Sequence, residues 1–181
     1  MINKKIRTIL IGCSILLLEL GVCSCQADRG KKDYTTWVNP FIGTLHEGHC
    51  SPAATVPMGM VQPGPESHSE YYAGYEMDHV VGYQYTDSLL KGFTQTHLNG
   101  VGCPAMSDIL MMPFSRDVNN DELLEAYYSD YDKNSEVASP GYYAVRLLKN
   151  DVGVELTASS HVAYHQYYFG TSAARVLIDL Q

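Results

Sequence analysis

The sequence predicts an all-β fold, and the simplest architecture for it is an antiparallel β-sandwich. Residues 142–149, 152–158, 161–169 and 174–180 alternate apolar and polar side chains, as strands with one buried face do. Turn-forming residues at 150–151 and 170–172 separate these segments, which predicts an antiparallel meander. The chain also has 14 Tyr against 4 Phe and 1 Trp, a bias that suits strands with a wet face and stacking on sugar rings.

The region before this meander is expected to be less regular. Residues 33–64 contain so many prolines and glycines that a long helix is excluded, while 53–56 and 58–62 are expected to be short strands. Residues 83–85 and 89–98 flank a turn at 86–88, in which Asp87 is expected to bond its own backbone. Residues 115–139 are polar and predict an insertion over the sheet, with a short helix at 121–128.

Residues 92–114 combine two expected strands with a glycine-rich turn. Residues 93–98 and 109–112 predict the strands, and Pro113 is expected to end the second one. Polar residues on a turn held between apolar strands are a common way to build a binding loop. An ordinary hairpin turn would explain the same residues. The candidate substrate-binding residues at this rim are His97, Asn99, Gly100, Gly102 and Cys103.

The first 25 residues predict a lipoprotein-type signal peptide. Lys4, Lys5 and Arg7 precede an apolar stretch at 9–18 that is too short to span a bilayer, and Cys25 follows the small residue Ser24. Cys25 is therefore the expected lipidation site, with export to the periplasm or to the outer-membrane or cell surface. Residues 26–35 are expected to form a tether and 36–181 one β-sandwich domain, incomplete at its C-terminus because it stops within a strand pattern.

Charge and motif content exclude several function classes. A formal net charge of −8 disfavours nucleic acid as a partner. The absence of GxGxxG, P-loop, G-x-S-x-G and H-E-x-x-H patterns argues against nucleotide-driven chemistry, serine hydrolysis and zinc peptidase action. Cys50 and Cys103 remain beyond the leader and either pair in an oxidising compartment or stay free. The carboxylates and histidines at 66–79 lack the ligand order of an EF-hand.

Six short motifs, together with the 92–114 stretch, resemble the N-terminal domain of glycoside hydrolase family 92. They are V-N-P-F-I-G-T at 38–44, H-C-S-P-A-A-T-V-P-M-G-M-V-Q at 49–62, G-Y-Q-Y-T-D at 82–87, S-P-G-Y-Y at 139–143, E-L-T-A at 155–158 and V-L-I-D-L at 176–180. The resemblance covers almost everything after the leader. A tryptophan that is frequent in the family just before the third motif is replaced here by Tyr75, Glu76 and Met77, which leaves the preferred linkage open.

The resemblance implies an exported, calcium-dependent exo-α-mannosidase that hydrolyses terminal mannose from glycans with inversion. In that family a helical (α/α)-barrel domain carries the catalytic acid, the base and most calcium ligands, and the sandwich contributes walls and loops. The chain is therefore expected to contain no catalytic residue, to need that separate catalytic domain, and to be inactive alone. Besides the mannose-containing glycan, the expected partner is the membrane, through a lipid anchor. The alternative is a non-catalytic carbohydrate-binding surface lipoprotein.

Overall fold

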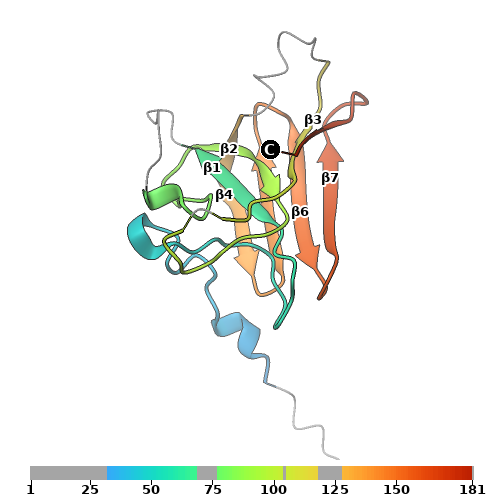
Figure 1. Ribbon diagram of the computed structural model, residues 1–181. Coiled ribbons are helices and arrows are strands. Elements are labelled where there is room, and N and C mark those ends of the chain that lie inside the picture. Colours follow the sequence, from blue (N-terminus) through green and yellow to red (C-terminus); the bar gives the residue numbers. More distant parts are fainter. Residues whose placement is uncertain (1–31, 69–76, 104, 118–127, 181) are drawn as a thin grey trace, which may run out of the picture. The chain divides into compact units, whose positions relative to one another are not determined.

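A computed structural model describes residues 32–68, 77–103, 105–117 and 128–180 (Figure 1). Contacts divide the chain into residues 1–33 and 34–181, and the second unit contains every described strand. The leader, Cys25 and most of the expected helix at 121–128 lie outside the described residues. The strands are β1 (Gly64–His68), β2 (Leu89–Thr94), β3 (Leu110–Phe114), β4 (Ser129–Ser139), β5 (Tyr142–Leu147), β6 (Val152–Ala158), β7 (Ala163–Phe169) and β8 (Arg175–Asp179).

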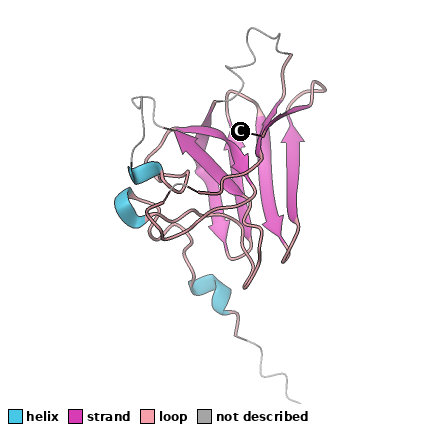
Figure 2. Cartoon of the chain, in the orientation of Figure 1, coloured by secondary structure: helices cyan, strands magenta, loops and turns pink. Residues whose placement is uncertain are grey.

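The predicted all-β fold is confirmed. Figure 2 shows that the regular structure of the described region is mainly strand, with helix limited to the short 3-10 turns Tyr34–Trp37, His46–Gly48 and Met77–His79. None of the helices in the described part of the chain is long and apolar enough to cross a membrane. All registered strand pairs are antiparallel, in the order β7-β6-β5-β4-β2-β3-β8, with β1 also paired to β2.

β4 connects two groups of strands into one curled sheet. Its first residues pair with β2, whereas its later residues pair with β5, and the β4–β5 register shifts between Asp132 and Val137. The interruption bends the strand, as a bulge does, and turns the β5–β6–β7 group to face the β2–β3–β8 group. The core between them is formed by fully buried apolar side chains from both groups, among them Leu90, Phe93, Met112, Tyr143, Leu147 and Val154.

The register break also brings a charged pair into the interior. Glu136 Oε1 accepts hydrogen bonds from the hydroxyls of Tyr83 (2.8 Å) and Tyr143 (2.7 Å), and both tyrosines are fully buried. Lys133 Nζ lies 2.6 Å from Glu136 Oε2 and 3.9 Å from the ring centroid of Tyr85. A buried carboxylate is tolerated here because its oxygens are engaged by hydroxyl and ammonium groups.

The structure corrects three predictions about the elements. β5, β6 and β7 form the predicted meander, but β8 pairs with β3 instead of following β7. Residues 129–139 are a strand and no insertion, because their polar side chains are satisfied where the sheet bends. Residues 53–56 and 58–62 form no strand; the chain there is irregular, and the strand begins later, at Gly64.

A fourth correction concerns the central stretch. β2 and β3 are adjacent, with Phe93 opposite Met111, as expected for 92–114. Pro113, however, lies inside β3 and faces Val176 of β8. The β2–β3 register covers only the Phe93–Met111 pair, so the backbone N–H that proline lacks is not needed on that side.

Candidate functional site

The loop after β2 contains the predicted turn. His97 and Met106 form an isolated antiparallel β-bridge, and a tight turn follows at Asn99 and Gly100. Gly100 has a φ of +75°, a conformation that glycine adopts without steric cost. Its backbone N–H donates to the carbonyl of His49 at 2.6 Å, so the turn is tied to the 49–62 segment.

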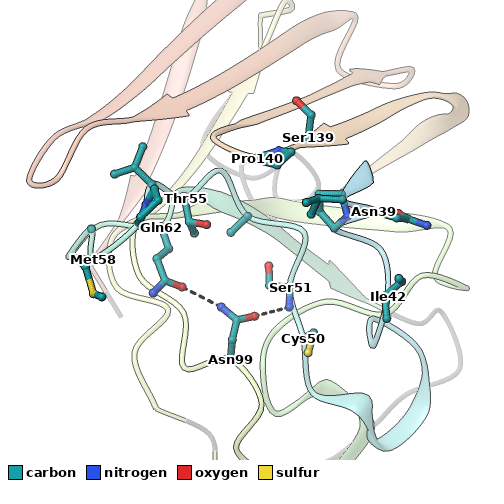
Figure 3. A pocket seen from close by; sticks show the side chains of 16 residues that line it. Asn39, Ile42, Cys50, Ser51, Thr55, Met58, Gln62, Asn99, Ser139 and Pro140 are labelled. Atoms are coloured by element: carbon teal, nitrogen blue, oxygen red, sulfur yellow. Dashed lines mark hydrogen bonds between the residues drawn. The ribbon is translucent and has the colours of Figure 1, made fainter. Parts of the chain in front are cut away.

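Asn99 joins three segments that are distant in sequence. Its Oδ1 accepts a hydrogen bond from the backbone N–H of Ser51 at 2.6 Å, and its Nδ2 donates to Oε1 of Gln62 at 2.8 Å (Figure 3). An amide supplies one acceptor and two donors, which is what this junction requires. Asn99 therefore fixes the rim of the turn against the irregular chain at 51–62.

His97 is buried beneath this rim. Its Nε2 lies 3.0 Å from Glu66 Oε1 and 3.1 Å from the Thr94 hydroxyl, and its Nδ1 lies 2.9 Å from the carbonyl of Gln62. Burial opposes ionisation of Glu66, yet hydrogen bonds and charge from His97, with a further bond from Thr94, hold the pKa of this carboxyl below 4.5. With both ring nitrogens in protein contacts, His97 positions the loop from below.

A cavity of about 640 Å³ lies beside Asn99 (Figure 3). Its walls come from four of the sequence motifs: residues 38–42, 50–62, Asn99, and Ser139-Pro140 at the end of β4. Figure 3 shows Asn99, Gln62 and Ser51 joined along one wall, with Pro140 and Asn39 across from them. The fold thus brings together segments separated by up to about a hundred residues.

The chemistry of these walls limits what the cavity can do. Ile42 and Met58 are among its lining residues and expose 75% and 98% of their surface. No Asp or Glu is among the described residues that line it. Hydrolysis of a glycosidic bond with inversion uses two carboxyl groups roughly 6.5–9.5 Å apart. The described walls can therefore bind and orient a ligand, but they do not contain such a pair.

Of the predicted site residues Asn99 lines the cavity, whereas His97, Gly100, Gly102 and Cys103 do not. A side chain built on Gly102 would meet the His49 ring and the Met77 methyl group at 3.5 Å, so Gly102 packs close to both. Cys103 is exposed, and Cys50, which does line the cavity, is partly buried. Both cysteines are free thiols, which answers the question of pairing that the sequence leaves open.

A second polar cluster contains serine, histidine and aspartate but does not arrange them as a catalytic triad. Asp87 Oδ2 accepts from the Ser67 hydroxyl at 2.5 Å and lies 2.7 Å from His79 Nε2. The carboxylate stands between serine and histidine, so the histidine is not positioned to take the serine proton. Asp87 was expected to bond its own backbone; instead its side chain bonds distant residues because β1 lies next to the 83–88 loop.

The described residues do not fit a metal centre. No group of three or more His, Cys, Asp or Glu side chains is placed there to hold an ion. The buried carboxylates Glu66, Asp87 and Glu136 already have histidine, hydroxyl or ammonium partners. A calcium ion needs six to eight oxygen ligands, and these groups do not converge to offer them.

Sequence reasoning identified Asn99 but missed most of the cavity. Gln62 and Ser51, which hold Asn99, lie in a proline-rich segment where no periodic pattern points to a site. The signal was the set of motifs themselves, since the segments 38–44, 49–62, 92–114 and 139–143 all reach the cavity or its rim.

Known proteins show extensive similarity to the chain. The profile of the Glycosyl hydrolase family 92 N-terminal domain matches residues 37–181. A family GH92 α-mannosidase from Bacteroides thetaiotaomicron, solved in complex with mannoimidazole, superposes with a TM-score of 0.71 at 32% identity, over 82% of this chain and 20% of that one. The GH92 family glycosyl hydrolase ccman5 superposes with a TM-score of 0.67 at 27% identity, over the same shares.

A curated relative from Arthroderma benhamiae, described as an uncharacterised secreted glycosidase, is 28% identical over 180 residues. The match covers 91% of this chain and 22% of the relative. The chain thus spans about a fifth of the length of the proteins it matches.

Proposed function

The chain belongs to glycosyl hydrolase family 92, whose N-terminal domain it carries. From this premise we propose that the chain is part of an exported α-mannosidase. In this proposal it is the β-sandwich part of a calcium-dependent enzyme that hydrolyses terminal mannose from glycans. The observation that carries the proposal is the likeness to the mannosidase from Bacteroides thetaiotaomicron over 82% of this chain.

The cavity beside Asn99 is proposed to form one wall of the mannose site. Asn99, Gly100, Gly102 and Cys103 would face the sugar or its neighbours, while His97 holds the loop from below. An amide side chain is suited to the hydroxyls of a sugar, because both kinds of group donate and accept hydrogen bonds.

The general acid and the base are assigned to a second domain that docks over this wall. Inversion places the acid at the leaving oxygen and the base at a water on the opposite face of the ring. The described cavity has no carboxylate for either role, and its exposed Ile42 and Met58 suit burial against another domain. Calcium in the complete enzyme would take its ligands from outside the described residues.

A direct test measures glycan binding and mannose release with the purified chain in the presence of calcium. We expect α-mannobiosides to bind without release of mannose, and Asn99→Ala to weaken binding roughly tenfold through the loss of two hydrogen bonds. Asn134→Ala, at an exposed position on β4, is the matched control. Release of mannose would contradict the assignment of both carboxylates to a second domain.

Export and lipid anchoring through Cys25 are a further part of the proposal. The basic and apolar leader supports it, as does the relative described as secreted. We expect the wild-type protein to sediment with membranes and Cys25→Ala to move to the soluble fraction, because a bacterial lipoprotein carries several acyl chains. Equal membrane partitioning of both proteins would contradict lipidation.

A further inference from the structure

We propose that the outward face of β5, β6 and β7 is a second glycan-binding surface, distinct from the cavity beside Asn99. It would bind an extended chain of pyranose sugars. We call this surface the tyrosine face, and it is formed by Tyr142, Glu155, Tyr164 and Tyr168 together with Gly153 and Gln166.

The position of these side chains follows from strand alternation. In β5, β6 and β7 the residues between them, such as Tyr143, Val154 and Leu156, point into the core. The tyrosines therefore point away from it, and Tyr164 and Tyr168 expose 58% and 47% of their surface. The chain has 14 tyrosines, and these three are not required by the core.

The strand register sets the spacing of the rings. Tyr142 and Tyr164 both lie opposite Thr157 of β6, so they are two strand spacings apart, roughly 10 Å. Tyr168 lies four residues further along β7 than Tyr164, roughly 13 Å away. Several pyranose rings of one chain can lie across a surface of this size.

The side chain of Tyr168 lies against Gly153. The two residues are opposite each other in the β6–β7 ladder, and a Cβ built on Gly153 would be in ordinary contact, 3.5 Å, with the Tyr168 ring carbon Cδ2. The ring is therefore close to the sheet at this position. A ring that lies along the sheet presents a face to solvent, and such a face can stack on the C–H groups of a sugar.

Glu155 lies between two of the tyrosines on this face. Tyr142 on β5 and Tyr168 on β7 are its diagonal neighbours across the two ladders. Desolvation first, and then the charge of Glu155, raise the pKa of each of these tyrosines. The carboxylate between the rings offers lone pairs that can accept hydrogen bonds from sugar hydroxyls.

The polarity of the tyrosine face favours a sugar over a protein partner. Centres of protein interfaces are depleted of charge, whereas this face has a carboxylate at its middle and Gln166 beside it. Flat aromatic rings next to hydrogen-bonding groups match a pyranose, which has an apolar face and a polar edge. The exposed apolar walls at Ile42 and Met58 suit protein docking, and they belong to the other site.

The choice of mannose-containing chains rests on the proposed function. The test therefore uses the full chain in affinity gel electrophoresis with yeast mannan and, separately, with xylan and dextran. We expect retardation by mannan, reduced roughly tenfold in Tyr168→Ala and in Tyr164→Ala by the loss of one stacking ring. Tyr168→Phe keeps the ring and should keep most of the binding. Asn134→Ala, at an exposed position on β4 outside both sites, should leave it unchanged.

Each outcome decides between the two sites. Loss of mannan binding in Asn99→Ala but not in the tyrosine variants would overturn the tyrosine face and leave the proposed function standing. Tyrosine-dependent binding of xylan or dextran but not of mannan would support the surface and count against mannose as the substrate. No retardation by any of the polymers would overturn the tyrosine face, whereas the mannobioside assay decides the proposed function. Thermal melts of the variants check that each is folded.

Discussion

His165 links β7 to the loop after β2. Its Nε2 lies 2.9 Å from Gln95 Oε1 and its Nδ1 lies 2.8 Å from the Tyr167 hydroxyl, so one nitrogen donates and the other accepts. Burial lowers the pKa of His165 from 6.5 to about 4. The neutral ring is therefore the form that the folded protein holds near neutral pH.

This histidine should make stability depend on pH. The unfolded chain binds the proton more tightly than the folded one, so the stabilisation is complete above pH 6.5 and is lost as the pH falls towards about 4. We expect the free energy of unfolding to fall by about 2 kcal/mol over this window, allowing for partial solvent exposure. Urea unfolding at several pH values measures it.

The matched variants are His165→Gln, which cannot titrate, and His161→Gln at an exposed position. His165→Gln should flatten the pH dependence of the unfolding free energy, and His161→Gln should retain it. An unchanged slope in His165→Gln would assign the effect to other groups.

Residues of the site were only partly predictable because their partners are distant in sequence. Asn99 was found through its glycine-rich turn, a local signal. Gln62, which accepts its hydrogen bond, lies 37 residues away and has no local pattern. His97 was expected at the rim with Asn99, but it is buried, with Glu66, Thr94 and the carbonyl of Gln62 as its partners.

Strand β4 is the element on which the curled sheet depends. Its register break places Glu136 under the hydroxyls of Tyr83 and Tyr143. Desolvation and the nearby Glu136 charge raise the pKa of Tyr143 well above 10.0, so its hydroxyl remains a donor. The bend is thus held by a buried network of polar side chains.

We expect Glu136→Ala to lower the free energy of unfolding by about 3 kcal/mol, because two buried tyrosine hydroxyls lose their acceptor and Lys133 loses its counter-ion. Glu47→Ala, the same chemical change on an exposed residue, should have little effect. Denaturant unfolding followed by tyrosine fluorescence compares the two. Equal stability of both variants would mean that solvent or neighbouring groups satisfy the network.

The sequence predicted elements well where one physical rule dominated. β5, β6 and β7 alternate between core and surface, and residues 152–158 match β6 at both ends. β4 was missed because it changes partners halfway, so its inward side chains include Lys133 and Glu136 rather than apolar residues. β8 was recognised as a strand, but alternation does not reveal which partner a strand chooses.

At the scale of the whole molecule, the exposed apolar wall should make the isolated chain prone to self-association. Met58 and Ile42 present most of their side chains to solvent next to the cavity. Surfaces of this kind promote association when nothing covers them. We expect the purified chain to self-associate, and the double variant Ile42→Thr, Met58→Gln to do so less at an unchanged melting temperature.

Light scattering coupled to size-exclusion chromatography measures this effect. Val137→Thr, at a half-exposed position on β4, serves as the control because it removes apolar surface outside the cavity. An equal reduction of self-association in Val137→Thr would mean that general surface hydrophobicity, and not the cavity wall, causes the association.

The pairing of β3 with β8 sets an order for folding. β5, β6 and β7 are joined by short turns, so their contacts are local and close quickly. β3 has β2 as an earlier neighbour, but its second partner, β8, begins some sixty residues after Phe114, at Arg175. Until β8 has been synthesised, that edge of β3, where Met112 pairs with Leu177, has no strand beside it. The docking of β8 against β3 should therefore be a slow final step of folding, and chaperones should bind the nascent chain before this step.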